Sequence, residues 1–292
     1  MSNPEIRQWR FDEHIDSYGR IYDFEWGRKL VELSQPAPVL SEMLFDLCLS
    51  FQGVSTTLAI PVLAVDAVEA FAKGTKLLEL SSSLQLQYAK HIIARLEQSH
   101  ALNSSIERTL LVKMLEWFGE VHEKIKGEEI PFPRQELWDG WVKVETDEGV
   151  DSRKNQFRIG IWASQRLAYS ALFFAYEDFI LQLLSAMGHG GLWTSNAHKF
   201  EDACRRVFGD ALAERCWLDS RIEDAKLIRH SLAHAGGRIT KHLKGRNHGV
   251  HVDGDRLQIM PHNVAALHHE LKGCVLALAE WAVDKPQFGP AK

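Results

Sequence analysis

Apolar residues recur every three to four positions along most of the chain, which is the spacing of an amphipathic α-helix. In the first half this pattern predicts four helices, over Val39–Phe51, Pro61–Ala72, Ser83–Leu96 and Ser104–Ile125. Proline is tolerated in the first turn of a helix and glycine is common just beyond the last, so the second of these helices is expected to begin at Pro61 and to stop at Gly74. The first half is therefore predicted to be a small helical bundle.

The second half continues the helical pattern and adds one exception. Its longest pattern covers Phe157–Met187, and further helices are predicted over Asn196–Phe208, Asp210–Trp217, Ser220–His234 and Val264–Val283. The exception is the turn sequence at residues 253–256, which lies between short β-prone runs at 251–252 and 257–260 and is typical of a small hairpin. The predicted fold class is all-α, with an N-terminal helical bundle, a C-terminal helical bundle and a small β-hairpin in the latter.

Between the two halves, residues 128–155 lose the helical period. Pro131 and Pro133 are followed by tryptophans and valines and then by a polar run, a pattern that indicates a connector with a short hairpin. The predicted organisation is therefore an acidic helical region at 1–127, a connector at 128–155 and a second helical domain at 156–292.

Composition is ordinary for a soluble globular protein, with 45% hydrophobic and 25% charged residues. The sequence has no run of 18 or more apolar residues and no apolar signal core at its start, so we expect a cytoplasmic protein without a membrane partner. Its four cysteines, Cys48, Cys204, Cys216 and Cys274, have no C-x-x-C spacing. They are predicted to be buried free thiols rather than a zinc ribbon or a disulfide framework.

The net charge of −5 conceals an asymmetry between the halves. Residues 1–150 carry 15 Lys and Arg against 24 Asp and Glu, whereas residues 151–292 carry 19 against 15. The second half also holds 10 of the 14 histidines. A polyanionic partner such as RNA is therefore compatible with the second half only.

The segment from Ser220 to Thr240 gathers the candidate chemistry. Ser220 and Glu223 have the spacing of a capping box, which predicts a helix start, and Gly236-Gly237 predicts its stop. Apolar residues between them recur at helical spacing and give the segment a buried face. Three residues able to handle phosphate or protons lie in its last two turns: Arg229, His230 and His234.

The Arg-x4-His spacing alone carries little weight. With 18 arginines and 14 histidines in 292 residues, about one match is expected by chance, and three occur. Arg95/His100 runs off a helix end and Arg246/His251 lies in a loop that enters a strand. Only Arg229/His234 combines the spacing with a capped helix and a glycine stop.

From about residue 157 to 283 the chain resembles the HEPN superfamily, helical domains of which many are metal-independent endoribonucleases. The matching features are the R-[polar]-x3-H motif at residues 229–234 followed by Gly-Gly, a Tyr-Glu-Asp-Phe segment at 176–179 on a long earlier helix, an Asp-Gly-Asp hairpin and a closing helix. A common HEPN variant has Asn where this chain has His230. The resemblance covers under half of the chain.

The resemblance implies RNA cleavage by attack of the 2′-hydroxyl, in the style of toxin–antitoxin or phage-defence proteins. His234 is expected to transfer protons, Arg229 to stabilise phosphate, and His230 to orient the substrate or to supply a second proton. On an ideal helix Arg229 and His234 point about 140° apart, so a homodimer with the site near its interface is expected to complete it. No cofactor and no metal are expected.

Two alternatives stay open. The domain could bind RNA or a partner protein without catalysis, or it could be structural or regulatory, with Arg229 anchoring a carboxylate such as Glu177. A zinc site is disfavoured because Ser231 stands where a zinc protease has Glu after its first His. The sequence has no glycine-rich nucleotide-binding motif of either the G-x-x-x-x-G-K-[ST] or the G-x-G-x-x-G type. Residues 1–127 carry no candidate chemistry. They could recognise a regulatory partner protein, restrain the second half or only scaffold it.

Overall fold

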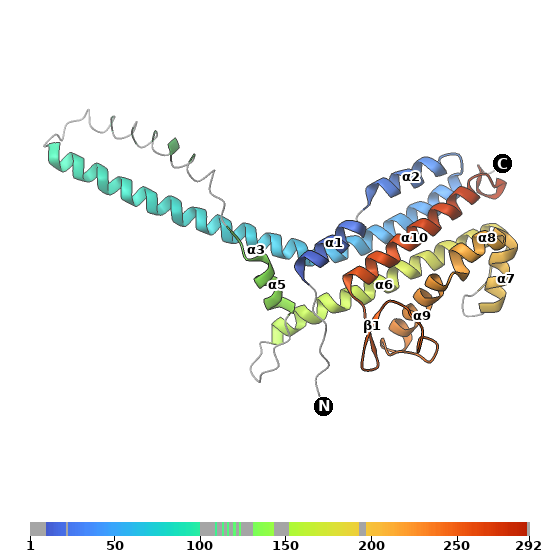
Figure 1. The fold of residues 1–292 in the computed structure, drawn as a ribbon. Helices are drawn as coiled ribbons and strands as arrows, with labels where there is room; N and C mark the ends of the chain where they lie inside the picture. The colour runs from blue at the N-terminus through green and yellow to red at the C-terminus, as the bar shows by residue number, and fades with distance from the viewer. Residues whose placement is uncertain are drawn as a thin grey trace. The chain divides into compact units, whose positions relative to one another are not determined.

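The computed structural model describes residues 10–21, 23–99, 131–142, 152–192 and 197–290, together with a few single helical positions between 109 and 123. Within these ranges the chain is mostly α-helical, with one two-stranded antiparallel hairpin near its C-terminal end (Figure 1). The predicted fold class is confirmed.

The elements follow one another in a simple order along the chain. The helices are α1 (Phe11–Ile21), α2 (Phe24–Ser34), α3 (Pro38–Ser99), α5 (Arg134–Val142), α6 (Ser152–Ala186), α7 (Ala197–Phe208), α8 (Asp210–Ala213), α9 (Ser220–His234) and α10 (Pro261–Ala282). A π-helical turn, η1 (Glu214–Leu218), follows α8, and a 3-10 turn, η2 (Pro286–Phe288), follows α10. The hairpin pairs β1 (His251–Asp253) with β2 (Arg256–Gln258), with Val252 opposite Leu257.

The helices predicted for the second half are confirmed. The pattern over 157–187 forms α6, those over 196–208 and 210–217 form α7 and α8 with η1, and the last forms α10. The hairpin also lies where the turn sequence predicted it. These elements form as expected because their apolar spacing, glycine stops and turn residues all favour the same local structure.

Packing divides the chain into two compact units, one made of Met1–Val62 with Trp138–Lys292 and the other of Leu63–Leu137. The predicted division at residues 128–155 stays a prediction, but packing groups residues 11–62 with the C-terminal helices. Leu30 of α2 and Leu44 of α3 belong to the same buried cluster as Leu172 of α6 and Leu271 of α10. Apolar faces far apart in the sequence thus share one core.

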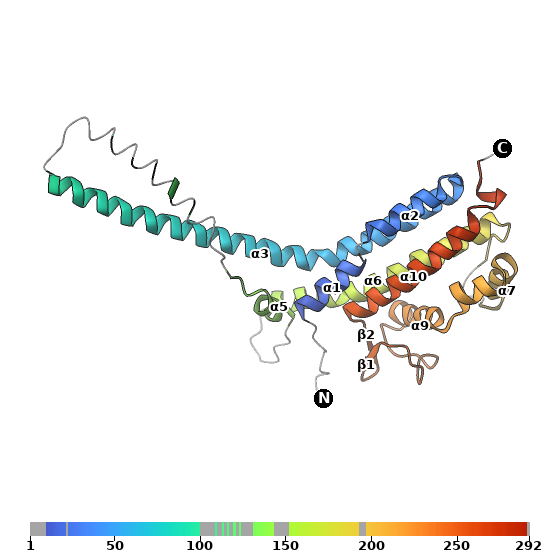
Figure 2. The ribbon, with the colours of Figure 1, turned by 45° about the horizontal axis from the view of Figure 1, so that its top comes forward.

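Helix α10 organises the larger unit. It contacts α1, α2 and α6, and the views in Figures 1 and 2 show α2 and α6 running alongside it. A helix that packs on several sides needs apolar residues around most of its circumference. The sequence of α10 meets this requirement, since its buried residues include Val264, Leu267, Leu271, Val275, Leu278 and Ala282.

Helix α3 corrects the prediction of separate helices in the first half. Residues 38–99 form one continuous helix, so neither Pro61 nor Gly74 ends it, and α3 rather than α6 is the longest helix described. Helix-forming residues on both sides outweigh the cost of about 1 kcal/mol for a helical glycine and about 3 kcal/mol for a helical proline. The helix predicted over 104–125 lies outside the described residues except for single positions.

Helix α5 corrects the expectation of a short hairpin in the connector. Residues 134–142 are helical, and Trp138 is fully buried. Its ring lies 5.2 Å from the ring of Phe11 and 5.2 Å from that of His14, measured between centroids. The tryptophan thus fills the core beside α1, a tertiary contact that the local aromatic and proline pattern did not indicate.

Two described helical stretches are long and apolar enough to cross a membrane by length and composition alone, Pro38–Leu84 and Gly160–Ala186. Core helices of soluble proteins pass the same test, and 56% of the apolar window in Gly160–Ala186 is buried inside the protein. The sequence predicted no membrane partner because it has no uninterrupted run of 18 or more apolar residues. That expectation stays a prediction.

Candidate functional site

Helix α9 begins at Ser220 as predicted, but its cap is a different residue. The carboxylate of Asp219 accepts a hydrogen bond of 2.8 Å from the backbone amide of Arg221. Glu223, which was expected to reach back to the amide of Ser220, instead accepts a hydrogen bond of 2.8 Å from the guanidinium of Arg246. A carboxylate at the cap position satisfies the free amides of the first turn, so the capping box between Ser220 and Glu223 is not needed.

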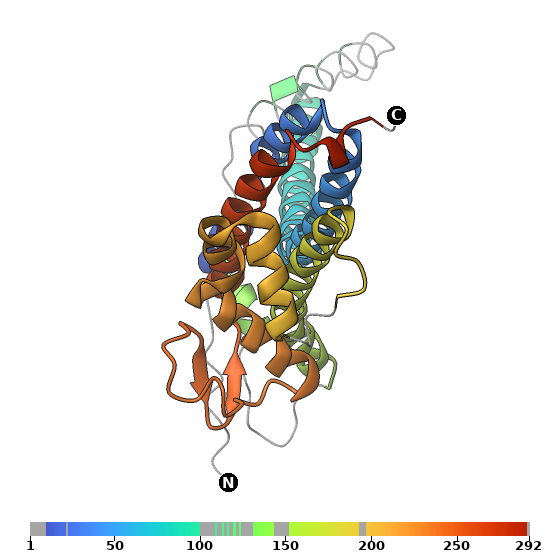
Figure 3. The same ribbon diagram turned by 90° about the vertical axis from the view of Figure 1, so that its right-hand side faces the viewer.

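The end of α9 is set by its two glycines, as predicted. Gly236 and Gly237 both have positive φ, +62° and +81°, and the amide of Gly237 donates a 2.9 Å hydrogen bond to the carbonyl of Ser231. Residues in this left-handed region commonly end a helix, and glycine adopts it without a steric cost. The carbonyl of Gly237 accepts a 2.8 Å bond from the amide of Leu257 in β2, so the hairpin is tied to the end of the helix (Figure 3).

Arg229 lies on the core side of α9. Its guanidinium forms a hydrogen-bonded ion pair with the carboxylate of Glu177 in α6, and it also lies 5.9 Å from the ring centroid of Phe173. Side-chain exposure is 17% for Arg229 and 6% for Glu177, so the pair is largely withdrawn from water. In this arrangement Arg229 anchors α9 to α6. This is the geometry expected if the role of Arg229 is structural.

The two histidines of the motif lie on the opposite, solvent-exposed side of α9. The ring centroids of His230 and His234 are 4.8 Å apart, as expected for positions i and i+4. Partial burial lowers the pKa of His230, and the positive charges of His234, Arg229 and His242 lower it further. The structure therefore brings the two imidazoles together and directs Arg229 away from them, in keeping with the angle expected on an ideal helix.

Sequence reasoning missed the arginine that contacts the glycine stop. A Cβ atom placed on Gly237 would lie 2.4 Å from Nη2 and 3.0 Å from Cζ of Arg166, so the guanidinium lies against the glycine itself. Burial lowers the pKa of Arg166, and the charge of Arg256 lowers it further. A signal for Arg166 was present, because it shares one face of α6 with Phe173 and Glu177 at helical spacing.

The other two Arg-x4-His matches do not form comparable clusters in the part of the chain that the structure describes. Arg246 binds two carboxylates of α9, Glu223 at 2.8 Å and Asp224 at 2.5 Å, and so holds the following loop against the helix. The side chains of Arg95 and His100 lie outside the described residues. Context rather than spacing thus distinguishes the three matches.

The cysteines and acidic side chains add no further centre among the described residues. Cys204, Cys216 and Cys274 are buried free thiols and Cys48 is a half-buried one. The described chain contains no group of three or more His, Cys, Asp or Glu side chains placed to hold a metal ion. The candidate chemistry therefore stays with the residues around the end of α9.

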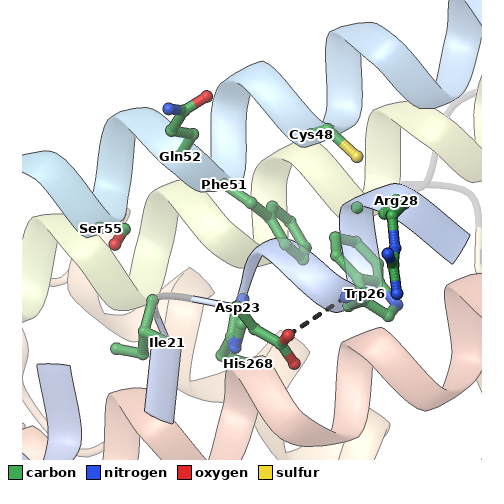
Figure 4. A pocket seen from close by; sticks show the side chains of 10 residues that line it. Ile21, Asp23, Trp26, Arg28, Cys48, Phe51, Gln52, Ser55 and His268 are labelled. Atoms are coloured by element: carbon green, nitrogen blue, oxygen red, sulfur yellow. Dashed lines mark hydrogen bonds between the residues drawn. The ribbon is translucent and has the colours of Figure 1, made fainter. Parts of the chain in front are cut away.

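One cavity, of about 220 Å³, lies between α2, α3 and α10. Figure 4 shows Trp26 and Phe51 side by side in its wall, with centroids 5.7 Å apart, and His268 nearby. The buried Nε1 of Trp26 and Oγ of Ser55 have no hydrogen-bond partner among the described residues. None of the three predicted site residues lines this cavity.

A larger cleft of about 510 Å³ lies between α9, α10 and the loop at residues 247–250. Its floor includes Ala225 and Ile228, and its rim includes His248 and His262. His230 and His234 line neither this cleft nor the smaller cavity. Both histidines are exposed to solvent, which suits contact with a polymer better than enclosure of a small molecule.

No protein-family model matches the chain, and neither does any curated protein or any solved structure. The resemblance to the HEPN superfamily therefore rests on residues 229–237 and on the order of the helices and hairpin around them. That resemblance stays a prediction.

Proposed function

We propose that the protein is a metal-independent endoribonuclease that cleaves RNA by 2′-hydroxyl transesterification at the surface formed by His230 and His234. The observation that carries this proposal is the exposed imidazole pair, 4.8 Å apart, at the glycine-stopped end of α9. RNA cleavage needs one group that accepts a proton and one that donates it, and two adjacent imidazoles can hold both roles near neutral pH.

In this proposal the two imidazoles divide the proton transfers between them, and the lowered pKa of His230 supports its role as the base. A lowered pKa favours the neutral imidazole, and in this proposal His230 accepts the proton of the 2′-hydroxyl as the 2′-oxygen attacks phosphorus. His234 donates a proton to the 5′-oxygen as the P–O5′ bond breaks. The products are a 2′,3′-cyclic phosphate and a 5′-hydroxyl end.

In this proposal Arg229 has a positioning role. Because it is paired with Glu177, its guanidinium reaches a phosphate only if that ion pair opens. Its role is therefore to hold the last turns of α9 against α6 so that the histidines stay in place. The direct contact with phosphate that the resemblance implies for Arg229 stays a prediction.

A second function, binding of RNA or a partner protein without catalysis, is favoured by a different observation. The Arg229–Glu177 pair is largely buried and accounts for the motif arginine in purely structural terms. In that case the histidines contribute only to a polar, partly cationic surface. The two functions differ in one measurable respect, which is whether RNA is broken.

The biological setting expected from the resemblance is also part of the proposal. We propose a cytoplasmic toxin or defence protein that acts as a homodimer and is restrained by a regulatory partner. Support for the homodimer comes from α6, where Leu167 and Phe174 lie seven residues apart and are 66% and 64% exposed. They lie on the same helix as Arg166 and Glu177.

The test is incubation of the full chain with 5′-labelled single-stranded RNA in EDTA. We expect fragments that end in 2′,3′-cyclic phosphate, and a loss of 10²-fold or more in rate for His230→Gln and for His234→Gln. His198→Gln, at an exposed histidine on α7, is the matched control and should keep the wild-type rate. Intact RNA in every sample refutes the enzyme, and salt-dependent binding without cleavage supports the binding module.

A further inference from the structure

A second feature near the end of α9 is a pair of arginines, Arg166 and Arg256, that have no anionic partner among the described residues. Arg166 reaches from α6 to the end of α9, where its guanidinium lies against Gly237. Arg256 begins β2 and is bridged through its backbone to Arg238, the residue after Gly237. The amide of Leu257, the residue after Arg256, donates a 2.8 Å hydrogen bond to the carbonyl of Gly237, so β2 meets the glycine that Arg166 contacts. The charge of Arg256 also lowers the pKa of Arg166.

Neither guanidinium forms a hydrogen bond or an ion pair with any other residue that the structure describes. The two nearest carboxylates of the hairpin already have partners. Asp255 pairs with Arg238 at 3.5 Å, and Asp253 accepts a 3.1 Å hydrogen bond from the side-chain amide of Gln258. The positive charge of Arg166 and Arg256 is therefore not balanced locally.

This arrangement is unfavourable unless an anion is present. Two like charges at a partly dehydrated position repel each other, which is why the pKa of Arg166 is lowered by burial and by Arg256. A guanidinium binds phosphate through two parallel N–H groups, and two guanidiniums from different elements can share one phosphate. The absence of a Cβ at Gly237 gives the Arg166 guanidinium its place, since a methyl group there would overlap it.

We propose that Arg166 and Arg256 form a binding subsite for a backbone phosphate of single-stranded RNA, next to the histidine pair. The naming of RNA rests on the proposed function, whereas the phosphate chemistry follows from the two arginines. Gly237 is three residues after His234, and three residues span at most about 11 Å, so the subsite lies within a few nucleotides of the proposed reaction centre. It supplies the phosphate contact that Arg229, held by Glu177, does not.

The experiment measures binding of a 2′-O-methyl oligoribonucleotide, which cannot be cleaved, by fluorescence anisotropy across a salt series. Arg166→Gln and Arg256→Gln are compared with wild type and with Arg206→Gln, a matched change at an exposed arginine of α7. Each subsite variant should weaken binding at least fivefold and lower the slope of log affinity against log salt. Because the two arginines share one phosphate, the fall in slope should not exceed about 0.7, the value for one phosphate contact on a single strand. Arg206→Gln should match wild type in both measures.

The outcomes separate the subsite from the enzyme. Wild-type affinity and salt slope in both subsite variants overturn the subsite even if RNA is cleaved through His234. Loss of affinity in both variants supports it even if the wild type cleaves nothing. Arg256 is exposed, so if Arg166→Gln lowers the melting temperature, Arg256→Gln decides the question by itself. Arg166→Lys keeps the charge without the planar fork and should bind with intermediate affinity.

Discussion

Arg229 and Glu177, 52 residues apart in the sequence, form a hydrogen-bonded ion pair between α9 and α6. The guanidinium of Arg229 also lies over the ring of Phe173, so the pair fixes the side of α9 that faces the core. The motif arginine therefore has a definite structural task, whatever chemistry takes place at the surface above it.

Removal of one partner of this pair should destabilise the fold. Arg229→Ala or Glu177→Ala leaves a largely buried charge without compensation, and we expect the free energy of unfolding to fall by about 3 kcal/mol in either variant. The double variant should lose less than the sum of the two. Urea denaturation measures all three. Arg205→Ala, which breaks an exposed pair with Glu214, is the control and should cost about 1 kcal/mol or less.

His268 should make the fold sensitive to acid. Its side chain is buried beside Trp26 and Phe51, and burial, with a further contribution from Lys272, lowers its pKa to about 4 from an ordinary value of 6.5. Between these two pH values the unfolded chain binds a proton that the folded chain refuses. Stability is therefore complete above pH 6.5 and should fall by about 3 kcal/mol as the pH drops to 4.

His268→Gln isolates this contribution. His14 and His230 also have lowered pKa values and act in the same direction, so the quantity to measure is the difference in pH dependence between wild type and variant. The paired carboxylate of Asp23 has a lowered pKa as well, but its contribution is lost only below about pH 4, outside the window. Identical pH profiles of unfolding free energy from pH 7 to 4.5 would contradict the assignment.

The two glycines that end α9 should respond differently to alanine. Both have positive φ, so Gly236→Ala and Gly237→Ala should each lower the unfolding free energy by about 1 kcal/mol through backbone strain. Only the methyl group at Gly237 would meet Arg166, whereas nothing lies within 4 Å of a Cβ at Gly236. We therefore expect weaker binding of the 2′-O-methyl oligonucleotide in Gly237→Ala alone, by anisotropy. Equal binding in the two variants would place Arg166 outside the subsite.

The cap of α9 gives a comparison between adjacent residues. Asp219→Ala removes the carboxylate that accepts the amide of Arg221, and the expected loss of unfolding free energy is about 1 kcal/mol. Ser220→Ala should be close to neutral because its side chain is exposed and the cap belongs to Asp219. Thermal melting of both variants tests this, and a larger loss in Ser220→Ala would restore the capping box that the sequence pattern indicates.

The exposed face of α6 tests the proposed homodimer. Leu167→Glu and Phe174→Glu introduce charge where a second copy is expected to cover apolar surface, so we expect monomers at concentrations at which the wild type is dimeric. Sedimentation velocity measures the association. Asp202→Lys, at an exposed acidic position on α7, is the control. A wild type that sediments as a monomer at all concentrations would overturn the dimer.

Several local features of the candidate site were predictable from the sequence. The helical period located α6 and α9, the Gly-Gly pair located the end of α9, and the turn residues located the hairpin. The side-by-side placement of His230 and His234 also follows from their spacing on a helix. These features depend on contacts between residues close together in the chain, which is why a local pattern determines them.

Other features depend on which distant segments meet. Local signals at Pro61 and Gly74 predicted helix ends, yet α3 continues through both, and Trp138 lies in a helix because it fills the core beside Phe11. Competition between nearby groups likewise gave the cap of α9 to Asp219, because Glu223 is held by Arg246. At these positions the local preference of the sequence for a helix end, a turn or a cap was weaker than the contacts made in the tertiary structure.

By itself, then, the sequence determined that this is a helical protein with an Arg-His-x3-His cluster at a glycine-stopped helix end and a hairpin after it. Only the tertiary structure decided that Arg229 turns inward to Glu177, that the histidines face water, and that Arg166 lies on Gly237 beside Arg256. The physical reason is the range of the interactions. Helical spacing is read over a few residues, whereas the partner of a charge is chosen by packing between helices that are about fifty residues or more apart.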